Sequence, residues 1–245
     1  MIPSFFRQTV LPIVMSLALC VAANAETVVL YGASGNLGSI IAAEALARDH
    51  DVIGVARNAA SMKIDHANFT AVSGDVTDVD SMAGIIDSAD VVIISVNGNG
   101  EGNLPENAIV NRAAQTFIAA ARRVGDDAPR VIQMGGGTTL YSDGELVLDT
   151  LGLEGGEPRH GIYYGHIAAL EHYRAAADIN WTVITPPPGA ALNAGERTGG
   201  FRVGEEEIIV GENGEASISR QDLAVLFINE VEDPQSIGKR ITLGY

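Results

Sequence analysis

The sequence predicts an α/β fold built on a doubly wound, mostly parallel β-sheet with helices on both faces. Short apolar, β-branched segments alternate with helical patterns along most of the 245 residues, and such alternation is typical of right-handed βαβ units. The segment Asp90–Val96, DVVIISV, is almost continuously apolar, as strands buried on both faces are. The length suits one large domain with a sizeable core.

The first 25 residues predict a signal peptide. Arg7 supplies a short positive region, residues 10–23 form an apolar run too short for a typical membrane span, and Ala23-Asn24-Ala25 is an A-x-A cleavage site. We therefore expect cleavage after Ala25, a single mature domain at 26–245, a periplasmic or secreted location, and no stable membrane insertion after cleavage. The alternative is a buried or membrane-anchoring N-terminal helix and a cytoplasmic protein.

Six strands are predicted from apolar, β-branched runs. Five of them alternate with helical patterns, so they are expected to lie in parallel. The sixth, Trp181–Thr185, is closed by the turn Pro186-Pro187-Pro188-Gly189. The other five are Thr27–Tyr31, Asp51–Ala56, Phe69–Ser73, Asp90–Val96 and Arg130–Met134.

Apolar residues at helical spacing predict the helices between these strands. Asp78 and Ser219 each precede such a pattern and can act as N-caps. Residues 141–159 are rich in glycine and acidic residues with little periodicity, so we expect a loop or lid there. The helices are expected at 36–48, 79–88, 104–124, 161–177 and 220–231, with further short strands and a small C-terminal α/β extension at 208–210 and 240–243.

Three glycines, Gly32, Gly35 and Gly38, separate the first strand from the first helix. Glycine allows a tight turn and a close approach of the backbone to an anion, and the following helix offers unpaired N–H groups to a pyrophosphate. The loop is therefore a candidate nucleotide site. An ordinary glycine-rich turn is the alternative, because this spacing alone is a weak signal.

The loops at the carboxyl ends of parallel strands converge, and ligands bind there. Arg57 follows the second strand, where an arginine accommodates a 2′-phosphate and an acidic residue would favour NAD. We therefore expect NADPH as cofactor, with NAD less favoured; a solvated charge is the alternative. Asp75, with Val76, is expected to face the adenine ring or, alternatively, to stabilise a turn.

Tyr163, Tyr164 and His166 are the candidate catalytic residues. A reductase needs a proton donor beside its acceptor, and tyrosine and histidine can both serve. Ile167 and Ala168 occupy the positions where a Tyr-x-x-x-Lys pair would carry its lysine, so either tyrosine would be a poor acid at neutral pH. Packing is therefore an equally supported role for these aromatic residues.

Composition excludes several other functions. The chain has 15 basic and 31 acidic side chains and a net charge of −16, which argues against nucleic acid as a partner. Cys20 is the only cysteine, so the sequence has no disulfide framework and no thiolate metal site. No grouping of histidine and acidic residues has the spacing of metal ligands, and no Ser-His-Asp constellation is legible.

Several motifs carry a family resemblance. GASGNLG at 32–38, GDVTD at 74–78, DVVIISV at 90–96 and TPPPG at 185–189 resemble the atypical short-chain dehydrogenase/reductases, which have a Rossmann-type fold. More narrowly, the chain is similar to the NAD(P)H-binding branch that includes NmrA-like proteins and biliverdin-IXβ/flavin reductases. Its C-terminal segments, 195–204, 215–234 and 239–245, are similar to bacterial proteins provisionally described as NADH-flavin reductases. The resemblance covers Thr27–Tyr245.

This resemblance implies roles for residues at matching positions. Arg57 would hold the adenosine phosphate, and Asp75 with Val76 the adenine. His166 falls where the flavin reductases have a histidine near the substrate, whereas Gly136 stands where they have a serine, with Thr138 and Thr139 close by. The loop contacting the pyrophosphate comprises Gly32, Ser34, Gly35, Asn36, Leu37 and Gly38, and Asn97 with Gly98 would contact the ribose on the nicotinamide side.

A complete set of nucleotide loops without a Tyr/Lys pair leads to three hypotheses. The first is an NAD(P)H-dependent oxidoreductase, specifically an NADPH-dependent reductase of a small planar acceptor of the flavin or quinone class, acting by direct hydride transfer. The second is a non-catalytic NAD(P)-binding sensor or scaffold. The third is a sugar-nucleotide epimerase or reductase. The sequence specifies neither the substrate nor the oligomeric state.

Overall fold

The computed structural model describes residues 25–189 and 195–245 and contains an eight-stranded, mostly parallel sheet. The strand order is β3-β2-β1-β4-β5-β8-β10-β9, and within this sheet only the β10–β9 pairing is antiparallel. The fold class expected from the sequence is therefore confirmed. The strands are β1 (Thr27–Tyr31), β2 (Asp51–Ala56), β3 (Phe69–Ser73), β4 (Val91–Ile94), β5 (Arg130–Met134), β8 (Trp181–Thr185), β9 (Arg202–Gly204) and β10 (Lys239–Gly244).

The strand order reverses direction between β1 and β4. The chain moves outward from β1 through β2 to β3, then returns to place β4 on the other side of β1. Loops leaving two adjacent strands in opposite directions open a crevice at their carboxyl ends, which is the usual ligand position in this architecture. The topology thus directs attention to the loops after β1 and β4.

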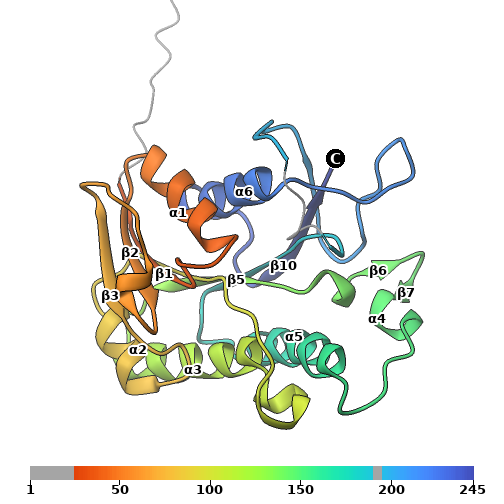
Figure 1. Cartoon of the computed structure of the whole chain (residues 1–245), viewed down its shortest axis with the longest axis horizontal. Coiled ribbons are helices and arrows are strands. Elements are labelled where there is room, and N and C mark those ends of the chain that lie inside the picture. Colours follow the sequence, from red (N-terminus) through yellow and green to blue (C-terminus); the bar gives the residue numbers. More distant parts are fainter. Residues whose placement is uncertain (1–24, 190–194) are drawn as a thin grey trace, which may run out of the picture.

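Helices cover both faces of the sheet (Figure 1). α1 (Gly38–Ala47) and α6 (Arg220–Glu232) pack side by side on one face. α2 (Val79–Ile86), α3 (Ile109–Val124) and α5 (Pro158–Ala175) form the layer on the other face, with α3 between its two neighbours. This three-layer arrangement buries the central strands on both sides, which explains the apolar composition of β4.

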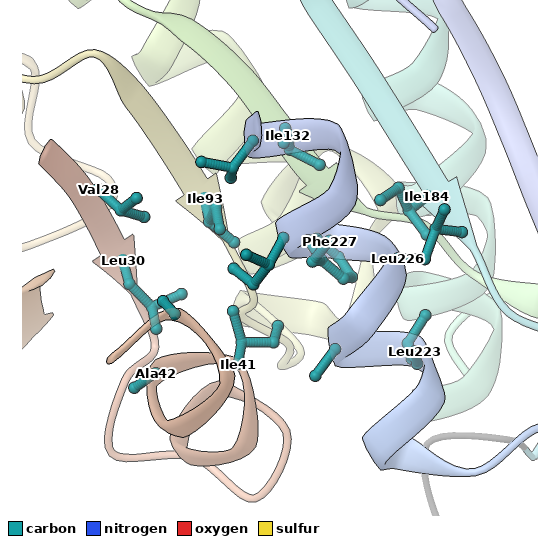
Figure 2. Close-up of a cluster of buried hydrophobic side chains, with 14 of the residues drawn as sticks. Val28, Leu30, Ile41, Ala42, Ile93, Ile132, Ile184, Leu223, Leu226 and Phe227 are labelled. Carbon is teal, nitrogen blue, oxygen red and sulfur yellow. The ribbon is translucent and has the colours of Figure 1, made fainter. Parts of the chain in front are cut away.

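Each face has its own hydrophobic core. In the first, drawn in Figure 2, side chains of β1, β4, β5 and β8 meet those of α1 and α6. Phe227 of α6 lies at the centre of this cluster and is fully buried. On the other face, Phe117 of α3 and Tyr173 of α5 are fully buried. Tyr173 donates a 2.7 Å hydrogen bond to the Gln133 side chain of β5, which fixes α5 against the sheet.

Two predicted helix starts are confirmed by their caps. The Asp78 carboxylate accepts hydrogen bonds from the backbone N–H groups of Asp80 and Ser81, at the start of α2. The Ser219 hydroxyl accepts one from Asp222, at the start of α6. Both helices therefore begin where the side-chain chemistry of the sequence indicates.

The helix expected at 104–124 is interrupted, so that prediction was wrong in its first turn. Pro105–Asn107 form a short 3₁₀ helix, and Ala108 is extended with ψ 133° before α3 begins at Ile109. The Ile109 N–H donates instead to the Gly98 carbonyl. This contact between the loop after β4 and the start of α3 competes with continuous helix and sets where α3 begins.

Residues 141–159 are also more ordered than expected. They contain the hairpin β6 (Tyr141–Ser142) and β7 (Glu145–Leu146), the short helix α4 (Val147–Thr150) and the first residues of α5. The hairpin is two residues deep on each side, too short to produce a legible alternation in the sequence. The segment therefore contains strands and helices, and the prediction of a loop without secondary structure was wrong.

The strand predicted at 208–210 was wrong in position. β9 lies earlier, at Arg202–Gly204, and pairs with β10. The Ile209 side chain packs instead close to Gly204 and Gly244, whose missing side chains leave room for it. The β-branched run at 208–210 therefore covers the edge of the sheet without joining it.

Within the described residues, no helix is long and apolar enough to cross a membrane. The predicted signal peptide occupies residues 1–25, almost all of it outside the described part of the chain.

Candidate functional site

The turn after β1 brings three backbone segments into direct contact. Gly32 has φ 88°, and a side chain there would place its Cβ 2.2 Å from the Ser95 carbonyl oxygen. A Cβ at Gly38 would lie 2.0 Å from the Gly32 carbonyl oxygen. Both positions therefore require glycine, and together they hold the start of α1 against the ends of β1 and β4. The unpaired N–H groups of a helix N-terminus are thus presented where an anion can bind.

A cavity of about 630 Å³ lies over the carboxyl ends of β1 to β4, within the range of about 300–1,000 Å³ typical of small-molecule sites. It gathers residues from four separate loops. Most of the predicted cofactor-binding residues line it: Gly32, Ser34, Gly35, Arg57, Asp75, Val76, Asn97 and Gly98.

Asp75 is held by its own turn and faces two guanidinium groups. Its Oδ1 accepts the Thr77 backbone N–H and the Thr77 hydroxyl, each at 2.8 Å. These hydrogen bonds, with smaller contributions from the charges of Arg112 and Arg57, hold the pKa of Asp75 below its usual value. The carboxylate is therefore ionised at neutral pH, and no described residue hydrogen-bonds to Oδ2. That oxygen can accept a hydrogen bond from a ligand such as the adenine amino group.

Tyr31, the last residue of β1, lines this cavity and carries an unsatisfied polar atom. Its side chain is 1% exposed, and among the described residues its hydroxyl has no hydrogen-bond partner. Burial raises the pKa of this phenol well above its ordinary value, so the hydroxyl remains a neutral donor. A buried hydroxyl without a partner carries a desolvation cost that a bound ligand or water can relieve.

A second cavity of about 490 Å³ adjoins the first. The two share Gly35, Ser95, Val96 and Asn97, at the crossing of the β1 and β4 loops. Its walls come from the loop after β5, the start of α5 and the proline turn after β8. The lining residues are Gly35, Asn36, Leu37, Gly38, Ser95, Val96, Asn97, Met134, Gly135, Gly136, Gly137, Thr138, Ile162, Tyr163, His166, Pro186, Pro187, Pro188 and Gly189.

The three consecutive glycines after β5 are each required by a different neighbour. At Gly135, a Cβ would lie 2.1 Å from the Thr185 Oγ1. At Gly136, it would lie 2.7 Å from ring carbons of His166. At Gly137, it would lie 2.6 Å from backbone atoms of the 186–188 turn. The glycines therefore let the floor, the proline wall and the His166 ring pack closely around one cavity. A serine at position 136 would collide with His166 where the ring now lies.

His166 and Tyr163 line the second cavity, but Tyr164 lines neither cavity. Tyr164 packs against the His160 ring, with centroids 4.4 Å apart. His166 is 8% exposed, and burial lowers its pKa to about 4. At pH 7 only about one His166 in a thousand would be protonated, so it is a weak source of protons and a better neutral hydrogen-bonding group.

Two features of the first cavity were missed in the sequence, namely Arg112 and the Tyr31 hydroxyl. Arg112 lies in the first turns of α3 and reaches the cavity because α3 starts against the loop after β4. Arg112 could have been predicted, because it is a basic residue that follows the 97–102 loop in the sequence. The burial of Tyr31 depends on helices distant in sequence, so no local pattern could indicate it. Lys63, a second cation that follows Arg57 in the sequence, lines neither cavity.

The residues present fit a dinucleotide better than a metal ion. The glycine turn and helix start suit a pyrophosphate, and the first cavity combines cations with a free carboxylate oxygen and an unpaired hydroxyl. No group of three or more histidine, cysteine or acidic side chains in the described residues could hold a metal ion.

Comparison with known proteins agrees with this geometry. A family profile described as NAD(P)H-binding matches residues 32–234. A structure from Burkholderia pseudomallei, provisionally named as an exported protein, is 32% identical, with 90% of this chain and 100% of that chain covered and a TM-score of 0.73. A protein of Bacteroides thetaiotaomicron provisionally named as an epimerase is 28% identical, with 91% and 98% covered and a TM-score of 0.78.

A third structure shares the fold at lower identity. It comes from Streptococcus pneumoniae, is provisionally named as an NADH-flavin reductase, and is 24% identical, with 90% of this chain and 99% of that chain covered and a TM-score of 0.68. At this level the likeness concerns the fold alone.

The low pKa of His166 predicts a pH dependence of stability. The unfolded chain binds a proton at His166 near pH 6.5 and the folded chain only near pH 4, so the free energy of unfolding should decrease as pH falls through that window. The full loss is about 3 kcal/mol. His166→Gln should lack this component, whereas His66→Gln, at an exposed histidine, should keep it. Urea denaturation between pH 7 and 4 measures the difference; parallel curves for wild type and His166→Gln would contradict the assignment.

Proposed function

The chain belongs to the NAD(P)H-binding family, and we propose that it is an NADPH-dependent reductase of a planar, electron-poor acceptor. The observation that carries this proposal is the pair of adjoining cavities. One has the charged and polar groups suited to an adenosine phosphate, and the other has the largely apolar walls suited to a ring. They meet at Gly35 and Asn97, where the reactive end of a dinucleotide would cross from one to the other.

The cofactor roles follow from this division. The turn Gly32–Gly38 would hold the pyrophosphate, with Ser34 and Asn36 exposed at its tip and Leu37 packed beneath it. Arg57 would pair with the 2′-phosphate, and Asp75 Oδ2 would accept the adenine amino group beside Val76. Asn97 and Gly98 would contact the nicotinamide-side ribose.

The second cavity would position the acceptor. When bound, NADPH supplies a hydride from its nicotinamide ring, so that a C–H bond breaks there, the acceptor gains a hydrogen and two electrons, and solvent delivers the second proton. The chain's contribution is to orient the acceptor ring and exclude bulk water. His166 and Tyr163 act as neutral hydrogen-bonding groups in this proposal, and Tyr164 serves packing.

An exported location is part of the proposal. The support is the A-x-A site at 23–25 and the likeness to a protein provisionally named as exported. Export of an unfolded chain would leave the cofactor to be acquired outside the cytoplasm, so location and cofactor supply must be tested separately.

Replacing Arg57 tests the cofactor preference. We expect Arg57→Ala to weaken NADPH binding about 10- to 100-fold, because a charge-assisted hydrogen bond contributes about 1.5–3 kcal/mol. NADH binding should change less than about threefold. Calorimetric titration of both nucleotides measures the two dissociation constants.

Two matched variants sharpen this experiment. Lys63→Ala removes an exposed charge that follows Arg57 in the sequence and lines neither cavity, so it should leave the ratio of the NADPH and NADH dissociation constants unchanged. Arg112→Ala removes the other guanidinium of the first cavity. If Arg112→Ala abolishes the preference for NADPH and Arg57→Ala does not, Arg57 is not the 2′-phosphate residue.

Turnover decides between an enzyme and a binding protein. We expect the purified protein to oxidise NADPH with at least one acceptor from a panel of flavins, quinones and small carbonyls, followed by absorbance of the reduced nucleotide. A thermal shift with NADPH, without turnover of any acceptor, would select the sensor or scaffold role. Conversion of a sugar nucleotide without net oxidation of NADPH would select the epimerase role.

The location has its own test. We expect mass spectrometry of protein from separated cell fractions to find a chain starting at Glu26 outside the cytoplasm. An intact chain starting at Met1 in the cytoplasm would exclude both cleavage and export.

A further inference from the structure

The described lining of the second cavity carries no charged side chain. None of the described residues that line it is a lysine, arginine, aspartate or glutamate, whereas the first cavity has Arg57, Asp75 and Arg112. His166 is the side chain of this lining that could become a cation, and burial keeps it neutral. The described lining therefore offers no cation that could pair with a phosphate or carboxylate.

Two arginines outside the lining are already engaged. Arg240, 4% exposed, donates to the Thr139 carbonyl oxygen at 2.6 Å and forms an ion pair with Glu206. Arg197 donates two hydrogen bonds to Glu44. Moving either arginine onto a ligand would break these contacts and leave Glu206 with Arg174 and Glu44 with Arg48, which costs free energy.

Arg159 and residues 190–194 do not add a cation to the described lining. Arg159 lies one turn before Tyr163 on α5 but does not line the cavity. Residues 190–194, which follow the proline turn, read Ala-Ala-Leu-Asn-Ala and carry no ionisable side chain.

Neutral hydrogen-bonding groups take the place of charges. Thr138 belongs to the lining, and its hydroxyl is buried without a hydrogen-bond partner among the described residues. Tyr163 adds a second hydroxyl and Asn97 an amide. A hydroxyl buried without a partner is costly, and a ring carbonyl would relieve that cost without bringing a charge into the cavity.

We propose that the second cavity selects an uncharged planar ring bearing carbonyl groups, such as a quinone or an isoalloxazine without a phosphate, and has no subsite for an anion. This inference rests on the proposed function, in which the cavity receives the acceptor. It narrows the acceptor class: FMN and other anionic acceptors gain nothing from their charge here, and the chain's net charge of −16 disfavours them further.

Two probe pairs test this inference by calorimetric titration in the presence of saturating NADP⁺. Riboflavin and FMN differ only in the phosphate, and 1,4-naphthoquinone and its 2-sulfonate differ only in the sulfonate. We expect the neutral member of each pair to bind as tightly as its anionic partner to within about threefold, or more tightly. Binding of the anionic member more than about threefold tighter in either pair, by a margin that salt weakens, reveals an anion subsite and overturns the inference.

A charge-insertion variant with a matched control locates the effect. Ile162→Arg places a cation in the cavity lining, and Ile237→Arg makes the same change at an exposed position outside both cavities. Ile162→Arg should shift the affinity ratio toward the anionic member about tenfold or more, and Ile237→Arg should not. An unchanged ratio in Ile162→Arg places the ring elsewhere and contradicts the inference.

The proposed NADPH site and the proposed preference for uncharged acceptors can fail independently. If NADP⁺ binds but none of the four probes does, the acceptor cavity is wrongly assigned and only the cofactor site stands. If NADP⁺ itself does not bind, the proposed function fails first, and a probe pair titrated without nucleotide then decides the charge preference alone.

Discussion

Close backbone contact at the carboxyl ends of the strands is the constraint on which the site depends. Gly32 and Gly38 leave no room for a Cβ beside Ser95 and beside each other, so β1, α1 and β4 converge at one point. Gly135 to Gly137 repeat the arrangement against β8, α5 and the proline turn. Side chains at these positions would separate the layers, and the two cavities would lose their common edge. Glycine here acts by volume as much as by backbone freedom.

Much of the fold could be predicted because its signals are local. β2, β3, β5 and β8 have the predicted bounds, since each is a short apolar run between polar loops. The predictions were wrong where contacts between residues distant in sequence determine the local structure. The Gly98 carbonyl accepts the Ile109 N–H, and α3 begins there instead of at residue 104. Ile209 packs against glycines of β9 and β10 instead of forming a strand. Local propensity contains no information about such partners.

The lining of the first cavity was easier to predict than that of the second. Its residues follow directly after strands, and in a parallel sheet those ends must meet. The lining of the second cavity depends on which face of α5 points inward. Tyr163 and His166 lie three residues apart and share a face, whereas Tyr164 is rotated away and packs on His160. Adjacent residues on a helix do not face the same way, so a run of aromatic residues could not identify the one that lines the cavity.

The packing of the His166 ring against Gly136 determines the protonation state of His166. Because Gly136 lacks a side chain, the His166 ring fills that space and becomes buried. Burial then lowers the pKa of His166 to about 4, which removes a proton donor at neutral pH. Reduction of an isolated carbonyl to an alcohol would need such a donor to protonate the developing alkoxide. A conjugated ring delocalises the charge it gains and can take its proton later from water, so a cavity of neutral groups suits a planar acceptor for the same reason that it suits the packing.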